Sequence, residues 1–181
     1  MSYKLSKGII QVYTGPGKGK TTAALGLAWR ALGAGLRVAF FQFLKGGIHT
    51  SELNMVGRFG PQLWFKRFAP AATPFSLGQG PPTDEDRRNI TAAWETAREA
   101  ILSGEWDLVV LDEINNVMAY GLLDVAEVLD VLQARPEHVE VVCTGRGAPR
   151  ELVESADLVT EMLMIKHPYE HGIQARKGIE L

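Results

Sequence analysis

Short apolar runs alternate with longer stretches of mixed polarity along this chain. The apolar runs have the length and composition of buried strands and cover residues 8–13, 37–43, 63–66, 108–111, 139–143 and 158–165. The stretches with helical composition cover residues 23–30, 83–102, 123–134 and 150–155. Strands that are apolar at consecutive positions are buried on both faces, which is typical of parallel sheets in α/β proteins. We therefore predict a mostly parallel sheet with helices on both faces.

Three segments interrupt this pattern. Residues 44–60 are rich in glycine and should be irregular. Residues 68–82 contain four prolines and no periodicity, so we expect a long loop, and such loops in compact domains are usually functional or disordered. The last segment, residues 166–181, is expected to form a hairpin or a tail. No domain boundary is visible, so residues 1–181 are treated as one domain.

The composition is that of an ordinary globular protein. An apolar content of 46% and a charged content of 22% suit one domain with a sizeable core. The net charge of −2 argues against broad binding to nucleic acid or to an anionic membrane. Cys143 is the only cysteine, and its apolar neighbours predict a buried, inert thiol. Since neither a secretory signal pattern nor a membrane-spanning run is present, we expect a cytoplasmic protein.

A glycine-rich turn lies between the first strand and the first helix, and its sequence is Gly15-Pro16-Gly17-Lys18-Gly19-Lys20-Thr21-Thr22. A strand, such a turn and a helix are the context of a P-loop, whose backbone N–H groups and helix N-terminus surround phosphate oxygens. Lys20 would add a full positive charge, and the Thr21 hydroxyl would ligate Mg²⁺. This P-loop is one residue shorter than usual, because Thr14 stands where the common pattern has its first glycine. The turn predicts a nucleoside triphosphate site without defining the reaction.

Two further strand ends carry candidate site residues. Asp112 and Glu113 end the apolar run 108–111 in the manner of a Walker B segment, and either carboxylate could ligate Mg²⁺. Arg146 follows the strand at 139–143, where it is explained equally well as a phosphate clamp or as a solvated turn residue.

Other charged or titratable residues are weaker candidates for the nucleotide site. Lys45 follows the second strand, and Arg30 lies ten residues beyond Lys20, where a surface charge is the default. A bend of the helix under the site would be needed to bring Arg30 to a ligand. His167 and His171 belong to the predicted tail and show no metal-ligand pattern.

Together these motifs resemble the P-loop ATP:corrinoid adenosyltransferases over almost the whole chain. The segments that carry the resemblance are residues 15–24, 42–46, 109–113, 134–136, 144–147, 156–158 and 166–167, with a closing K-H…G…A…G-I-E pattern. In this family the shortened P-loop is a common trait. The resemblance implies the α/β fold of RecA-like P-loop NTPases.

The resemblance also implies a reaction. Reduced cobalt(I) of a corrinoid attacks the 5′-carbon of ATP and triphosphate leaves, in adenosylcobalamin biosynthesis or salvage. Since the nucleophile belongs to the substrate, the protein would orient the reactants and stabilise charge, with Lys20, Glu113 and Arg146 in catalytic roles. Mg²⁺ or Mn²⁺ would be held by Thr21, Asp112 and Glu113. The residues expected to bind ATP are Gly15, Pro16, Gly17, Lys18, Gly19, Lys20, Thr21, Thr22 and Arg30.

Members of this family use an aromatic loop to displace the lower axial ligand of the corrinoid. Phe75 matches the family's phenylalanine, whereas Leu77 stands where a close relative would carry tryptophan. The short segment before Gly8 differs from the long charged helix that covers the site in some members. The resemblance further implies a homodimer and an electron-donating reductase as partner. The corrinoid substrate, a biosynthetic intermediate or complete cobalamin, stays open.

Two other functions remain open from the residues alone. A P-loop kinase acting on a small molecule or nucleoside would need an acid that positions the acceptor and a lid with arginines. Arg87 and Arg88 are the candidates for such a lid, but they are expected on an exposed helix face. An ATP-gated binding module would leave the nucleotide intact. Release of triphosphate distinguishes the adenosyltransferase from both.

Overall fold

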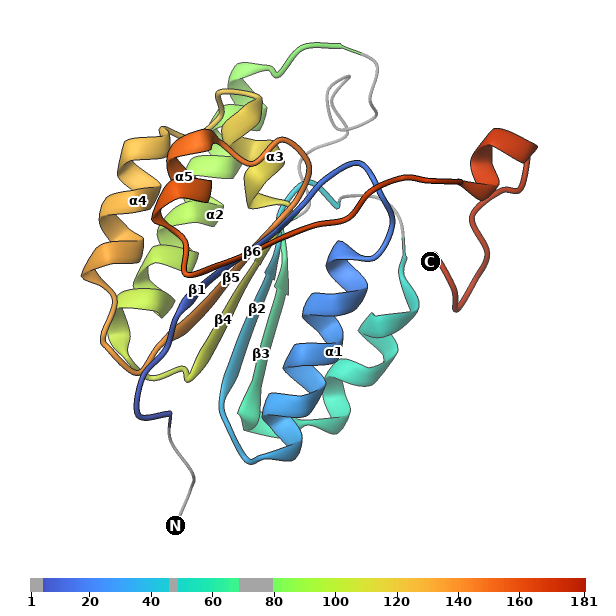
Figure 1. The fold of residues 1–181 in the computed structure, drawn as a ribbon. Helices are drawn as coiled ribbons and strands as arrows, with labels where there is room; N and C mark the ends of the chain where they lie inside the picture. The colour runs from blue at the N-terminus through green and yellow to red at the C-terminus, as the bar shows by residue number, and fades with distance from the viewer. Residues whose placement is uncertain (1–4, 46–48, 69–79) are drawn as a thin grey trace.

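A single six-stranded sheet forms the centre of the molecule (Figure 1). The computed structural model describes residues 5–45, 49–68 and 80–181. The strands, in chain order, are β1 (Ile10–Thr14), β2 (Val38–Gln42), β3 (Leu63–Arg67), β4 (Leu108–Asp112), β5 (Glu140–Thr144) and β6 (Leu158–Glu161). They lie in the order β3-β2-β4-β5-β1-β6, and every neighbouring pair runs parallel. The predicted parallel sheet is confirmed.

Helices cover both faces of this sheet, as the sequence predicts. The α-helices are α1 (Lys20–Gly33), α2 (Asp84–Ser103), α3 (Ile114–Ala119), α4 (Val125–Ala134) and α5 (Arg150–Ser155). Short 3-10 helices are η1 (Ser51–Arg58), η2 (Gly60–Gln62) and η3 (Pro168–His171). Figure 1 shows α1 on one face and the other four α-helices on the opposite face. No helix among the described residues is long and apolar enough to cross a membrane.

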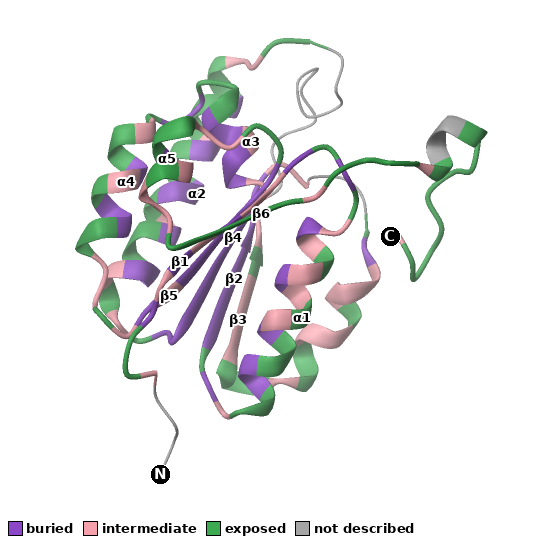
Figure 2. Ribbon diagram, viewed as in Figure 1, coloured by how far each residue is buried: buried purple, intermediate pink, exposed green. Residues whose placement is uncertain are grey.

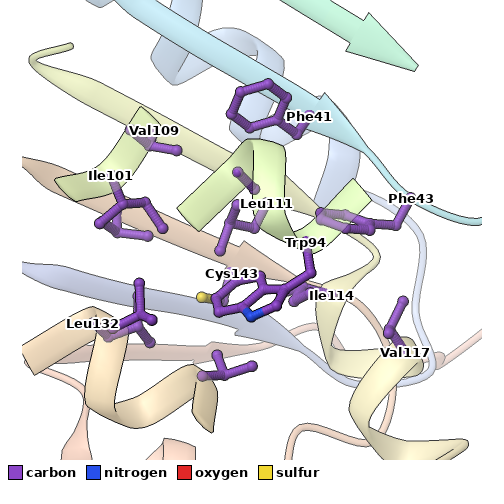
Figure 3. Packing of buried hydrophobic residues seen from close by; sticks show 14 of the residues in the cluster. Phe41, Phe43, Trp94, Ile101, Val109, Leu111, Ile114, Val117, Leu132 and Cys143 are labelled. Carbon is purple, nitrogen blue, oxygen red and sulfur yellow. The ribbon is translucent and has the colours of Figure 1, made fainter. Parts of the chain in front are cut away.

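The central strands are buried because successive side chains enter two different apolar clusters. In β2, Phe41 packs into the cluster beneath α2 to α5, and its neighbour Phe40 packs into the cluster beneath α1. Figure 3 shows Phe41 in the larger cluster with Trp94 and Cys143, all fully buried. A fully buried phenylalanine such as Phe41 contributes about 1.5–3 kcal/mol to the free energy of unfolding. Burial also raises the pKa of the Cys143 thiol to about 12, as expected for an inert thiol.

The predicted helix at 83–102 is confirmed, and its first residue has a clear cause. The Thr83 hydroxyl accepts a hydrogen bond from the backbone N–H of Asp86, while the Asp86 carboxylate accepts one from the backbone N–H of Thr83. This capping box satisfies donors that the first turn would leave unpaired. The helix ends at Gly104, whose φ of 64° is the left-handed conformation that glycine adopts at low cost.

Several elements differ from the sequence-based expectation, among them α3, η1 and β6. Helix α3, which begins directly after Glu113, was not predicted. Residues 51–58, expected to be irregular, form η1. Strand β6 ends at Glu161, opposite Thr14 at the end of β1, and not at residue 165. Beyond it the chain meets the P-loop, where the carbonyl oxygen of Met162 accepts a hydrogen bond from the N–H of Gly17.

Candidate active site at the carboxyl edge of the sheet

The P-loop connects β1 to α1, and its glycines are required by close contacts as well as by conformation. Gly15 and Gly19 have φ values of 95° and 125°. Gly17 donates its N–H to the carbonyl oxygen of Met162, and a Cβ at Gly17 would lie only 2.6 Å from the carbonyl oxygen of Leu163. The loop therefore fits tightly against the segment that follows β6.

Lys20, the first residue of α1, places its ammonium group inside this loop. Its Nζ donates to the carbonyl oxygens of Gly15 and Gly17, both at 2.7 Å, and the residue is only 9% exposed. Desolvation by burial lowers the pKa of Lys20, and the positive charge of the nearby Arg146 lowers it further. The carboxylates of Glu113 and Asp112 act in the opposite direction. A positive charge held among loop amides is the arrangement that binds polyphosphate.

Asp112 ends β4 and is fully buried, with four hydrogen-bond donors around its carboxylate. Its Oδ1 accepts from the hydroxyls of Thr21, at 2.8 Å, and Thr144, at 2.6 Å. Its Oδ2 accepts from Lys45, at 3.0 Å, and from the amide of Gln42, at 3.3 Å. These donors come from α1, β5 and the end of β2, so the sheet register assembles the group. A buried charge that is fully hydrogen-bonded is rigidly oriented.

Glu113 follows directly and has a left-handed backbone, with φ of 70°. Its N–H donates to the Thr144 hydroxyl, which itself donates to Asp112, so one threonine fixes both acidic residues. Desolvation raises the pKa of Glu113, and the negative charge of Asp112 raises it further, while Lys45 and other cations act in the opposite direction. Strained backbone of this kind is concentrated at functional sites.

The oxygen donors at this edge suit a hard divalent cation. The Thr21 hydroxyl and the Asp112 carboxylate are in direct contact, and Glu113 adds a second, half-buried carboxylate beside them. Mg²⁺ typically takes one or two protein carboxylates and completes its shell with water and substrate phosphates. Across residues 5–45, 49–68 and 80–181, no cluster of three or more His, Cys, Asp or Glu could hold a metal ion by itself. The donor set therefore fits an ion that arrives with a phosphate ligand.

Arg146 reaches the site from the turn that follows β5. Its backbone N–H donates to Oδ1 of Asn116, at 2.6 Å, and Asn115 donates to the carbonyl oxygen of Gly145, at 3.2 Å. A side chain at Gly145 would clash with Asn116, and its φ of 131° also requires glycine. Two asparagines of α3 thus hold the turn, a role that the sequence analysis missed although only Ile114 separates them from the acidic pair.

A cavity of about 480 Å³ opens in front of the P-loop, and the C-terminal segment forms one of its walls. The ammonium of Lys18 lies 2.7 Å from a carboxylate oxygen of Glu180. The hydroxyl of Ser51, in η1, donates to the carbonyl oxygen of Leu181 at 2.8 Å. Residues 178–181 therefore line the cavity, whereas the sequence analysis expected only a hairpin or tail. Figure 1 shows the end of the chain returning toward α1.

Most of the predicted site residues are brought together at this cavity. Those that line it are Pro16, Gly17, Lys18, Gly19, Lys20, Thr21, Thr22, Glu113 and Arg146. Gly15 and Asp112 join them through hydrogen bonds to lining residues. His167, assigned to the tail by its sequence, also lies on the cavity wall.

Comparison with known proteins identifies the family. A sequence model of the family described as ATP:corrinoid adenosyltransferase BtuR/CobO/CobP matches residues 6–181. The chain belongs to this family. It is 39% identical over 179 residues to a corrinoid adenosyltransferase of Pseudomonas aeruginosa, covering 96% of this chain and 84% of the relative. It is 38% identical over 174 residues to corrinoid adenosyltransferase CobA of Salmonella typhimurium, covering 96% of this chain and 86% of the relative.

Solved structures with little sequence similarity share the fold. The flagellar accessory protein FlaH of Methanocaldococcus jannaschii matches with a TM-score of 0.60 at 12% identity, covering 87% of this chain and 72% of FlaH. The RadB recombinase matches with a TM-score of 0.51 at 19% identity, covering 87% of this chain and 75% of RadB. These likenesses confirm the RecA-like P-loop architecture of this adenosyltransferase family member.

One predicted site residue, Arg30, is not brought to the cavity of this family member. Arg30 lies exposed in the last turn of α1 and does not line the cavity. Ten residues of straight helix separate it from Lys20, a distance of about 15 Å at 1.5 Å per residue. Phe75 lies outside the described residues, as does Leu77.

Proposed function

We propose that this chain transfers the 5′-deoxyadenosyl group of ATP to the cobalt(I) of a corrinoid and releases triphosphate. The family match over residues 6–181 carries the proposal. The cavity supports it, because its P-loop suits a polyphosphate and its donors would stabilise a leaving anion. The kinase alternative is not favoured, since the curated relatives are corrinoid adenosyltransferases.

The protein's own contribution is the binding and stabilisation of the triphosphate. The substrate's cobalt supplies the electron pair for the new cobalt–carbon bond, and the electrons of the broken carbon–oxygen bond leave on the triphosphate. The Lys20 ammonium and the loop N–H groups would bind that anion, and Arg146, which also lines the cavity, would clamp it. Lys20 would exchange its two carbonyl acceptors for phosphate oxygens.

Thr21, Asp112 and Glu113 would hold Mg²⁺ or Mn²⁺. When bound, this ion neutralises part of the charge on the triphosphate. Thr144 would keep both carboxylates in place through its two hydrogen bonds. We further propose a homodimer, an electron-donating reductase as partner and a cytoplasmic location. Phe75 would contact the corrinoid.

The test is the reaction itself. Purified protein with ATP, Mg²⁺ and chemically reduced cobalamin should yield adenosylcobalamin, recognised by the loss of its characteristic absorbance under light. Phosphorus NMR should detect triphosphate. Formation of ADP without a cobalt–carbon bond would contradict the proposal, and parallel assays with incomplete corrinoids would identify the preferred substrate.

Replacing Lys20 tests the role of the P-loop. Lys20→Ala should lower kcat/KM for adenosylation by about 10²–10³-fold or more, because a charged donor to the leaving group is lost. Circular dichroism melting should show that the variant folds. Lys7→Ala removes an exposed lysine outside the site and should leave the rate unchanged. Full activity of Lys20→Ala would remove the P-loop from the mechanism.

A further inference from the structure

Lys45 lies at the same carboxyl edge of the sheet as Asp112 and Glu113, although the sequence analysis considered it only a weak candidate for the site. It follows β2, whose last residue Gln42 is aligned with Asp112 of β4. Its Nζ donates to the Thr21 hydroxyl at 2.8 Å and lies 3.0 Å from Oδ2 of Asp112. The ammonium group therefore lies between the two residues whose oxygens best suit a divalent cation.

The backbone directs Lys45 to this place. Leu44 has φ of 38° and Glu113 has φ of 70°, and these are the non-glycine residues with positive φ among the described part of the chain. Glu113 directly follows β4, and Leu44 lies two residues after the end of the neighbouring strand β2. Leu44 packs against the large apolar cluster, while the next residue turns to Thr21. Left-handed backbone at a leucine is unfavourable and persists only where the surroundings enforce it.

The charge balance gives Lys45 a specific task. Asp112 is fully buried, and its other donors, Thr21, Thr144 and Gln42, are neutral. Among the described residues, the cation that forms an ion pair with this carboxylate is Lys45. A buried carboxylate without a cation is costly. A divalent ion and the Lys45 ammonium would compete for the same oxygens of Thr21 and Asp112. Their positive charges would also repel each other at such close range.

We propose that Lys45 acts as an internal counter-ion that keeps free divalent cations away from Thr21 and Asp112. Metal then enters together with a polyphosphate, whose negative charge gives the ammonium a new partner and draws it out of the metal position. This inference rests on the proposed function only in assuming that the physiological ligand is a metal–triphosphate complex. It makes Lys45 a specificity-determining residue, since it admits the metal complex of ATP and excludes the metal alone.

The experiment measures Mn²⁺ binding by electron paramagnetic resonance in protein without nucleotide. Lys45→Met should bind Mn²⁺ at least about tenfold more tightly than wild type, because a nearby positive charge is removed. Lys45→Arg keeps the charge and should behave as wild type. Lys66→Met, which removes an exposed lysine of the adjacent strand β3, should not change Mn²⁺ affinity. The double variant Lys45→Met/Asp112→Asn should lose the gained affinity.

The proposal is overturned if Lys45→Met binds Mn²⁺ no better than wild type. It is equally overturned if Lys45→Arg binds Mn²⁺ as tightly as Lys45→Met, or if the gain survives removal of Asp112. A second measurement needs no variant: wild type should acquire a bound Mn²⁺ signal only when inorganic tripolyphosphate is added, and equal binding without it would refute the inference. None of these readouts involves a corrinoid, so failure of adenosylation would leave them interpretable.

Discussion

The two sides of the nucleotide cavity are built in opposite ways. On one side, Asp112, Gln42 and Thr144 are fully buried and bonded to one another at the ends of β2, β4 and β5. On the other side, β6 and the C-terminal segment that follows it are exposed along most of their length. Figure 2 shows the contrast, with purple central strands and a green C-terminal segment.

This difference separates a preorganised half of the site from an adjustable half. Hydrogen bonds in a buried network are strong and fix the direction of each group. Exposed ion pairs such as Lys18–Glu180 contribute little and are screened by salt. The P-loop lies between the two sides, held by Lys20 from within and by Met162 from the exposed segment. Substitutions on the two sides should therefore differ in size and in kind.

The largest effect is expected where the P-loop contacts the C-terminal side. Gly17→Ala places a methyl group 2.6 Å from the carbonyl oxygen of Leu163, so the loop or the segment must shift. We expect a loss of about 1–3 kcal/mol in the free energy of unfolding, as for other overpacked sites, with weaker ATP binding. Urea denaturation and calorimetric titration measure both.

Gly26→Ala is the matched control for this substitution. Gly26 lies inside α1, and a Cβ there has no atom within 4 Å. Alanine should raise the free energy of unfolding by about 1 kcal/mol through its higher helix propensity. If Gly17→Ala were as stable as Gly26→Ala, the close contact between the P-loop and the segment after β6 would be disproved.

An effect of intermediate size is expected from Glu113, on the preorganised side. Its raised pKa means that the folded protein holds this proton more tightly than the unfolded chain does. The free energy of unfolding therefore falls as pH rises from the ordinary glutamate value through the raised one. Glu113→Gln abolishes this loss, so it should melt at a higher temperature than wild type at pH 7, with little difference at pH 4.

The same variant should lose adenosylation activity if Glu113 helps to hold the metal. Stability and activity would then change in opposite directions, as occurs at strained sites. Glu99→Gln, on the exposed face of α2, provides the control and should alter neither property. A lower melting temperature of Glu113→Gln at pH 7 would refute the account of its environment.

The sequence predicted the parts of this site that are local. The P-loop follows from a strand, a glycine-rich turn and a helix that are contiguous, and Asp112 and Glu113 follow from a single apolar run that ends in acids. Arg146 was a candidate on the same kind of evidence, one strand and the turn after it, although a solvated turn residue explained it equally well. In each case the neighbours that determine the position of the residue are adjacent in the chain.

The missed parts depend on contacts between distant segments. Thr144 reaches Asp112 across strand pairing, and residues 178–181 reach the P-loop after more than 150 residues of chain. No local pattern encodes such contacts. Arg30 illustrates the converse, since its helix was predicted but ten residues, about 15 Å along the helix axis, separate it from Lys20. Hydrophobic periodicity predicts helices and strands better than it predicts which of their ends lie together in the folded protein.

The smallest effect is expected from the exposed ion pair over the cavity. Lys18 is paired with Glu180, which also pairs with Arg176, and both cations help to keep the pKa of this exposed carboxyl well below its usual range. Glu180→Gln would leave Lys18 available to phosphate and should tighten ATP binding by about 2–5-fold in calorimetric titration at low salt, with less gain as salt rises. In a Lys18→Met background the same substitution should have no effect, because the cation that it releases is gone. If ATP binding still tightens in that background, the ion pair between Lys18 and Glu180 does not control the nucleotide affinity. The C-terminal segment would then act on the nucleotide by another route, such as the hydrogen bond between Ser51 and Leu181.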